Sequence, residues 1–151
     1  MDLDDFIPAY LTWLANRWAR SASALYLKRF GIGFEAWRII VLLAIEGPIT
    51  ANRVCQVIGM DKASVSRNFK GLHQKGLLRI DAVAEDGRQR LAQLTRTGFE
   101  LHGRMLPLVL QREGRLLACL TKDERDLFRD LLRRVYANLD QLDSPSDYES
   151  E

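Results

Sequence analysis

The stretch DKASVSR, residues 61–67, carries small, hydroxyl-bearing and basic side chains in close succession. If Asp61 caps a helix here, Val65, Phe69 and Leu72 share one apolar face, because residues three and four apart lie on one side of a helix. The other faces can enter a major groove, where hydroxyls bond base edges and cations bind phosphates or guanine. A solvated amphipathic helix is the alternative. The side chains that this pattern marks for DNA contact are Ser64, Ser66, Arg67 and Lys70.

A second basic group follows in EDGRQR, residues 85–90. Asp86-Gly87 is typical of a tight hairpin turn, which would place Arg88 and Arg90 at the hairpin tip. A long cation at such a tip can reach an adjacent minor groove. Asp86 could pair with Arg88 and hold its guanidinium in one direction. An ordinary soluble turn is the alternative interpretation.

The elements that must position these side chains are mostly helices. Apolar spacing, with caps at Asp4 or Asp5, Thr50, Asp61, Thr95 and Thr121, predicts them. The expected helices cover the residues before the break FGIG (30–33), then 34–46, 51–58, 62–75, 96–120 and 122–139. Residues 77–83 and 90–94 are expected to be extended, and Pro107 to kink its helix or cost a hydrogen bond. A short helix, a glycine-containing turn, a second helix and a hairpin make a winged helix-turn-helix.

The totals fit one ordinary domain of 151 residues, 47% hydrophobic and 28% charged. No apolar run has a membrane-spanning length, and the acidic N-terminus is unlike a targeting signal, so we expect a cytoplasmic protein with no membrane partner. Of the 20 acidic residues, three lie in 1–5 and five in 140–151, whereas all 22 Lys and Arg lie between. A basic body favours a polyanion partner, although scattered arginines also keep helices soluble.

Other chemistry finds little support. Cys55 and Cys119 fall in apolar helical patterns, which predicts two buried thiols and no disulfide. His73 and His102 are isolated, and no cluster has metal-ligand spacing. There is no Gly-rich phosphate loop, nucleophile elbow or perturbed carboxylate pair. We expect no metal, no cofactor and no enzymatic activity.

The segments IGMDKASVSRNFKGLHQKGLLRI (58–80) and EDGRQRLAQLT (85–95), followed by Gly98, resemble the MarR family of winged-helix transcriptional regulators. The likeness lies in the V-S-R recognition helix, the K-G-L exit, the D-x-R wing and the L-T-x-x-G entry to the next helix. Ile58 stands where leucine is usual, and His73 where an acidic residue is common. The resemblance covers nearly the whole chain.

The resemblance implies a mainly α fold with a small β-hairpin wing and dimerisation helices from both termini. Residues 1–33 and 96–142 would form the dimer, which fits a first helix that is apolar on two sides. Residues 34–95 would be the winged helix-turn-helix, and the acidic tail 143–151 is expected to be disordered. A homodimer reads a pseudo-palindromic operator whose half-sites lie about one helical turn apart.

The resemblance also assigns roles to residues. Ser64, Ser66, Arg67 and Lys70 match groove and phosphate contacts, Lys62 a phosphate contact, and Arg88 a minor-groove contact oriented by Asp86. Such proteins usually act as repressors. The alternative function is an architectural or protein-interaction module with no effector.

Many relatives release DNA when a small phenolic or aromatic acid binds. An arginine beside Trp rings suits an aromatic carboxylate, through a salt bridge and stacking. In some relatives a first-helix arginine clamps such a ligand, and Arg17 is the candidate here. The tryptophans could instead be core or dimer anchors. The full candidate set is Trp13, Arg17, Trp18, Trp37 and Arg38.

Overall fold

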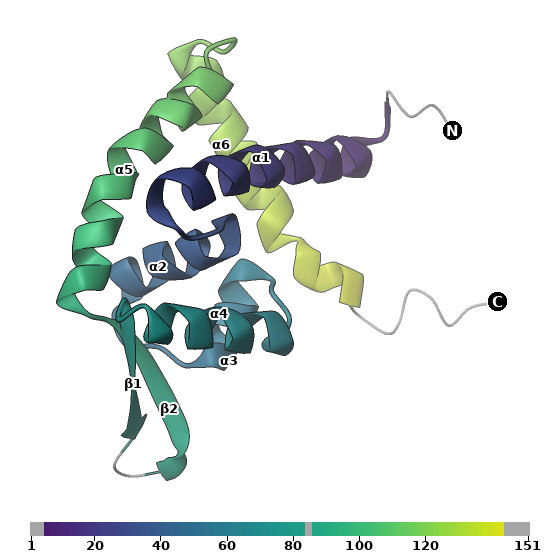
Figure 1. The fold of residues 1–151 in the computed structure, drawn as a ribbon. Helices are drawn as coiled ribbons and strands as arrows, with labels where there is room; N and C mark the ends of the chain where they lie inside the picture. The colour runs from purple at the N-terminus through teal and green to yellow at the C-terminus, as the bar shows by residue number, and fades with distance from the viewer. Residues whose placement is uncertain (1–4, 84–85, 144–151) are drawn as a thin grey trace. The chain divides into compact units, whose positions relative to one another are not determined.

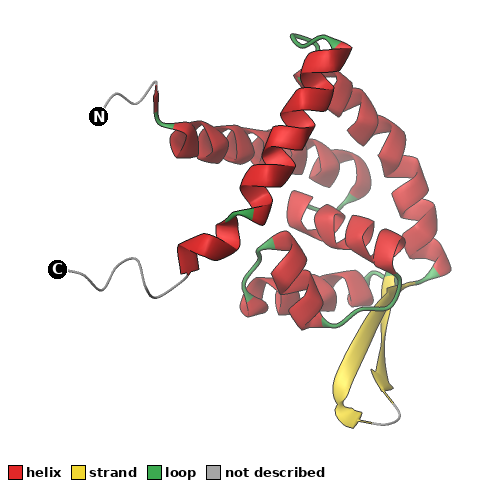
Figure 2. Cartoon of the chain, turned by 180° about the vertical axis from the view of Figure 1, so that it is seen from behind, coloured by secondary structure: helices red, strands yellow, loops and turns green. Residues whose placement is uncertain are grey.

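A computed structural model of the chain describes residues 5–83 and 86–143, without the side chains of residues 83–89 and 143. It is mainly helical with one antiparallel hairpin, as predicted (Figures 1 and 2). The elements are α1 (Ile7–Phe30), α2 (Phe34–Glu46), α3 (Ala51–Ile58), α4 (Lys62–Gln74), β1 (Leu78–Val83), β2 (Asp86–Leu94), α5 (Arg96–Leu116), α6 (Lys122–Ala137) and the 3-10 helix η2 (Leu139–Asp143). The chain divides into two compact units, Met1–Pro107 and Leu108–Glu151. Among the described residues, no helix combines the length and the apolar character needed to cross a bilayer.

Helix α2 is the centre of the first unit. Its sequence FEAWRIIVLLAIE is apolar on nearly all sides, and such a helix is buried. It packs against α1, α3, α4 and β2. Its buried side chains are Ala36, Trp37, Ile39, Ile40, Leu42 and Leu43.

The helix-turn-helix is fixed by its caps, which confirms the predicted boundaries to within a residue. The Thr50 hydroxyl accepts a hydrogen bond from the Arg53 amide at 3.2 Å, and Gly59 ends α3 at a left-handed φ of 71°. Asp61 then caps α4 by accepting from the Ser64 amide at 2.8 Å. Short polar caps therefore set where the second helix starts.

The hairpin corrects one prediction. Asp86 and Gly87 are not the turn, because both lie in β2, and Val83 pairs with Asp86 across the connection. The ladder extends further than the local Asp-Gly signal suggests, with a register irregularity after Ala82. A further bridge joins Ile49 to Ala92 through two backbone hydrogen bonds of 3.0 and 2.9 Å, so the loop before α3 adds a short third pairing.

The start of α5 is locked against the exit of α4. The Thr95 hydroxyl donates to the Gly76 carbonyl at 2.6 Å and accepts from the Gly98 amide at 3.1 Å, as expected of a cap. A Cβ on Gly98 would lie 2.1 Å from the Leu77 carbonyl oxygen, so only glycine fits. Pro107 lies inside α5, as predicted.

The second unit contains the end of α5, helix α6 and η2. The predicted capping box is present: the Glu124 amide donates to the Thr121 hydroxyl at 3.3 Å, and the Thr121 amide donates to the Glu124 carboxylate at 2.7 Å. No residue of α6 is buried. Its exposed apolar side chains are Leu127, Leu131, Leu132, Val135 and Tyr136.

Four further predictions were wrong. Neither Asp4 nor Asp5 caps α1, because its N-cap is Phe6, which makes no side-chain cap hydrogen bond. The helix starts beyond Asp5, where Pro8 fits its first turn. Helix α5 ends at Leu116 rather than Leu120. Cys119 consequently lies in the surface turn after α5 and is exposed, and Cys55 is half-buried, so the two thiols are not both in the core. The tail predicted to be disordered starts at residue 143, but Asp143 ends the 3-10 helix η2; residues from 144 onward lie outside the described residues.

Candidate nucleic-acid interface

Helix α4 presents the polar face that its sequence predicts. Val65, Phe69 and Leu72 are buried against the rest of the first unit. Ser66, Arg67 and Lys70 are exposed, and so is Lys62 at the start of the helix. Hydroxyl and cationic groups of this face can therefore reach a ligand outside the protein, which is what groove binding requires.

Ser64 differs from the other predicted contact residues because it is only 9% exposed. Its hydroxyl donates to the Asp61 carboxylate at 2.7 Å and accepts from the Arg67 guanidinium at 2.8 Å. The Ser64 amide and hydroxyl hold the pKa of Asp61 below its usual range, and the positive charge of Arg67 adds to this. The geometry makes Ser64 a link that orients Arg67, and its contact with DNA stays a prediction.

Two polar residues are not singled out by the sequence patterns: Asn68 of α4 and Glu35 of α2. Asn68 donates through its side-chain amide to the Glu35 carboxylate at 3.0 Å and to the Ser64 carbonyl at 2.9 Å. An asparagine inside a helix competes with backbone hydrogen bonds and is unfavourable there. That penalty was the available signal that Asn68 has a tertiary partner.

The wing residues are described in part. Arg90 is exposed in β2 and pairs with Ala82 of β1. The hairpin is drawn in Figure 1, and Arg90 lies within its ladder rather than at its tip. The side chains of Asp86 and Arg88 lie outside the described residues, so their predicted ion pair is outside them too.

The five candidate ligand residues have different surroundings. Trp13 and Arg17 are exposed on α1, and the Trp13 ring meets Tyr10 edge-on at 5.5 Å. Trp18 is half-buried. Trp37 is buried and stacks on His102 at 5.4 Å, which fits the alternative of a core residue.

Arg38 is the fifth member of the set, and it is engaged inside the first unit. Its guanidinium donates to the Ile58 carbonyl, at the end of α3, and lies 5.7 Å from the Phe34 ring centroid. Burial lowers the pKa of Arg38, and the nearby Glu35 charge opposes this. The structure thus uses Arg38 to join two helices.

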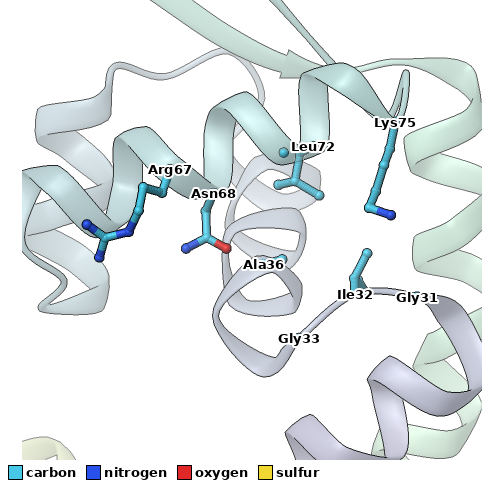
Figure 3. A pocket seen from close by; sticks show the side chains of 9 residues that line it. Gly31, Ile32, Gly33, Ala36, Arg67, Asn68, Leu72 and Lys75 are labelled. Atoms are coloured by element: carbon cyan, nitrogen blue, oxygen red, sulfur yellow. The ribbon is translucent and has the colours of Figure 1, made fainter.

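A cavity of about 230 Å³ lies between α4 and the turn joining α1 to α2. Figure 3 shows Asn68 beside Ala36 of α2, and Lys75 reaching toward Ile32. None of the five candidate ligand residues lines this cavity. It is lined by Gly31, Ile32, Gly33, Ala36, Arg67, Asn68, Gly71, Leu72 and Lys75.

Comparison with known proteins identifies this arrangement. The model of the MarR family matches residues 30–89, from the end of α1 into the wing. A MarR/EmrR family transcriptional regulator from Acinetobacter sp. ADP1 is 31% identical, with a TM-score of 0.86, and the alignment covers 93% of this chain and 99% of that one. The chain belongs to the MarR family. It is a DNA-binding transcriptional regulator of the winged-helix type, and its relatives are regulators rather than enzymes.

Two further solved structures are similar. A cysteine-to-serine mutant of MarR from E. coli, complexed with operator DNA, is 25% identical with a TM-score of 0.75, covering 89% of this chain and 99% of that one. The PcaV transcriptional regulator from Streptomyces coelicolor, in complex with its natural ligand, is 25% identical with a TM-score of 0.74, covering 91% and 96%.

Proposed function

We propose that this protein is a repressor that binds a pseudo-palindromic operator as a homodimer and leaves it when a small aromatic or phenolic ligand binds. The observation that carries the proposal is the exposed polar face of α4, with Ser66, Arg67 and Lys70 on a helix whose start is fixed by its Asp61 cap. The operator complex of the similar E. coli MarR supports it. We also propose that the protein acts in the cytoplasm, where this DNA target would lie.

The first test is fluorescence anisotropy with a duplex from the gene's own upstream region and a scrambled duplex, at several salt concentrations. We expect a preference of roughly a thousandfold or more and a steep salt dependence. Equal weak binding to several upstream duplexes and to the scrambled one would favour the architectural alternative. No binding at low salt would favour a protein-interaction module.

The wing is tested separately through Arg88, which we place in an adjacent minor groove. Arg88→Ala should cost roughly 1–3 kcal/mol of operator affinity, because a long cation inserted in the groove is lost. Titration of the operator duplex by anisotropy measures this. Wild-type affinity in Arg88→Ala would show that the wing does not contact DNA.

The homodimer is supported by apolar side chains that each unit leaves exposed. On α1 and the residue before it these are Phe6, Ile7, Tyr10, Leu11, Trp13, Leu14 and Leu27, and α6 adds the five named above. Large exposed apolar surfaces mark interaction sites, and a second copy of the chain is the partner we propose.

The ligand proposal is supported by the aromatic and guanidinium groups of α1 and by the ligand-bound structure of the similar PcaV. Arg17 would bind a carboxylate while Trp13 or Trp18 stacks on its ring. We expect salicylate or 4-hydroxybenzoate to release the wild-type protein from its operator. The same ligands should not release the Arg17→Ala variant. Arg20→Ala, an exposed neighbour on the same helix, is the control. Release of both variants at the same ligand concentration would exclude Arg17.

A further inference from the structure

Helix α2 sends two polar side chains to the helix-turn-helix, and we call them the α2 clamp: Glu35 and Arg38. They lie three residues apart in the first two turns of α2, so they share one side of the helix. Glu35 accepts a hydrogen bond from Asn68 of α4 at 3.0 Å. Arg38 donates to the Ile58 carbonyl, the last residue of α3. One helix therefore holds both helices of the DNA-binding motif by side-chain hydrogen bonds.

The Arg38 contact is made where α3 needs a donor. The last carbonyls of a helix lack intrahelical partners and carry the negative end of its dipole. The Arg38 guanidinium is half-buried and also lies over the Phe34 ring, so its position is fixed from two sides. Lysine could supply the charge but not the planar group that stacks and donates together.

The Glu35 contact leads directly to the proposed DNA-binding side chains. Asn68 is half-buried, and its amide donates to both Glu35 and the Ser64 carbonyl. Ser64 in turn accepts from Arg67 through its hydroxyl. Asn68 thus joins Glu35 of α2 to the Ser64 backbone, and the Ser64 hydroxyl holds the Arg67 guanidinium on the exposed face of α4.

We propose that Glu35 and Arg38 are positioning residues for sequence-specific DNA binding. The inference rests on the proposed function. Hydrogen bonds to base edges require a recognition helix held within about 0.5 Å, whereas phosphate contacts tolerate larger shifts. Loss of the α2 clamp therefore weakens operator binding more than non-specific binding, although neither residue touches DNA.

The test compares Glu35→Ala and Arg38→Met with wild type by anisotropy, on the operator duplex and on a scrambled duplex at one salt concentration. Glu100→Ala and Arg104→Met are matched controls, because they make the same charge changes at exposed sites of α5. We expect the operator preference to fall about tenfold in the clamp variants, since a charged hydrogen-bond partner is lost, and to stay near wild type in the controls. Glu35→Gln should keep most of the preference, because its amide oxygen still accepts from Asn68.

A merely structural role is separated by two readouts. The inference would be overturned if a clamp variant lost equal affinity for the operator and the scrambled duplex together with a lower Tm. It would also be overturned if the operator preference stayed at the wild-type value. A double-mutant cycle of Glu35→Ala with Asn68→Ala should show a second loss much smaller than the first, and additive losses would contradict the Glu35 pairing. If Arg38→Met does not fold, Arg38→Lys takes its place in every comparison and is expected to lose part of the preference.

Hydrogen exchange of the full-length protein without DNA tests the α2 clamp independently of any operator. The amides of residues 59–64 should exchange faster in Arg38→Met or Arg38→Lys than in wild type, because the end of α3 is released. Unchanged exchange would overturn the inference whatever the DNA result. Faster exchange in variants of a protein that prefers no operator would overturn the proposed function and leave only the structural part of the inference, that the α2 clamp holds the end of α3.

Discussion

At the scale of single residues, Lys70 tests which side chains on the exposed face of α4 contact phosphates and which recognise bases. An ammonium group is a point charge that neutralises a phosphate but reads no base by a fixed fork of donors. We expect Lys70→Ala to weaken binding to operator and scrambled duplexes about equally, and to lower the salt slope by about 1. Lys122→Ala, an exposed lysine at the start of α6, is the control. A loss confined to the operator would instead make Lys70 a base-reading residue.

Gly98 is a residue whose importance is steric rather than chemical. An added Cβ would lie 2.1 Å from the Leu77 carbonyl oxygen, which is backbone and cannot rotate away. Gly98→Ala should therefore lower the free energy of unfolding by about 1–3 kcal/mol, as overpacking does. Urea denaturation followed by circular dichroism measures it.

Gly103 supplies the control within the same helix, because a Cβ there would meet no atom within 4 Å. Gly103→Ala should stabilise the protein by about 0.5–1 kcal/mol, since alanine loses less entropy than glycine in a helix. If both substitutions shift stability in the same direction, the close approach of α5 to the α4 exit does not explain Gly98.

At the scale of elements, the cap of α4 makes a pH prediction. Hydrogen bonds from Ser64 lower the pKa of Asp61 in the folded protein. A group whose folded pKa is depressed contributes stability above its unfolded pKa, and that stability is lost as the pH falls through the folded value. Glu46, beside Arg53, and Glu124, which accepts from Thr121, are shifted in the same direction. The wild-type free energy of unfolding should therefore fall below about pH 4.

Asp61→Asn isolates the part of this pH-dependent stability that comes from the cap of α4. Asparagine caps a helix about as well as aspartate but does not titrate. Between neutral pH and pH 3, urea denaturation should show a smaller loss of stability in Asp61→Asn than in wild type. Parallel losses in the two proteins would mean that the Asp61 carboxylate contributes nothing pH-dependent to the fold.

The same elements show how far a sequence of this kind can be interpreted. Helix α2 follows from its unbroken apolar sequence, and the starts of α3, α4 and α6 follow from Thr50, Asp61 and Thr121, because these signals are local. The hairpin connection did not follow from Asp86-Gly87, because strand pairing decides it. The pattern placed Ser64 on a flank of the helix, whereas its burial depends on long-range packing.

The α2 clamp could not be predicted from the sequence for a related reason. Glu35 and Asn68 are 33 residues apart, and neither residue belongs to a spacing that signals the other. The sequence likewise gives no sign that Arg38 donates to the Ile58 carbonyl in another helix. Local patterns thus predicted the exposed polar face of α4 but not the contacts that hold it.

At the scale of the whole molecule, the apolar side chains of α6 decide whether one chain is the functional unit. Leu131 and Val135 are 43% and 51% exposed and lie one turn apart on the same face. Such a face costs free energy in water unless another apolar surface covers it. In our proposal the cover is a second copy, whose two-fold axis would place two α4 helices about one DNA turn apart.

Leu131→Lys should therefore dissociate the protein, because an ammonium group would have to be buried in the interface. Sedimentation equilibrium at micromolar concentration should give a dimer for wild type and a larger monomer fraction for Leu131→Lys. Ile45→Lys, at a 75% exposed position on α2 outside the proposed interface, should stay dimeric. Because two half-sites bound together gain effective concentration, Leu131→Lys should also lose affinity for the full palindrome while keeping its affinity for one half-site. A monomeric wild-type protein that binds the full palindrome and the single half-site equally would contradict two-fold recognition. Each α4 would then bind DNA alone.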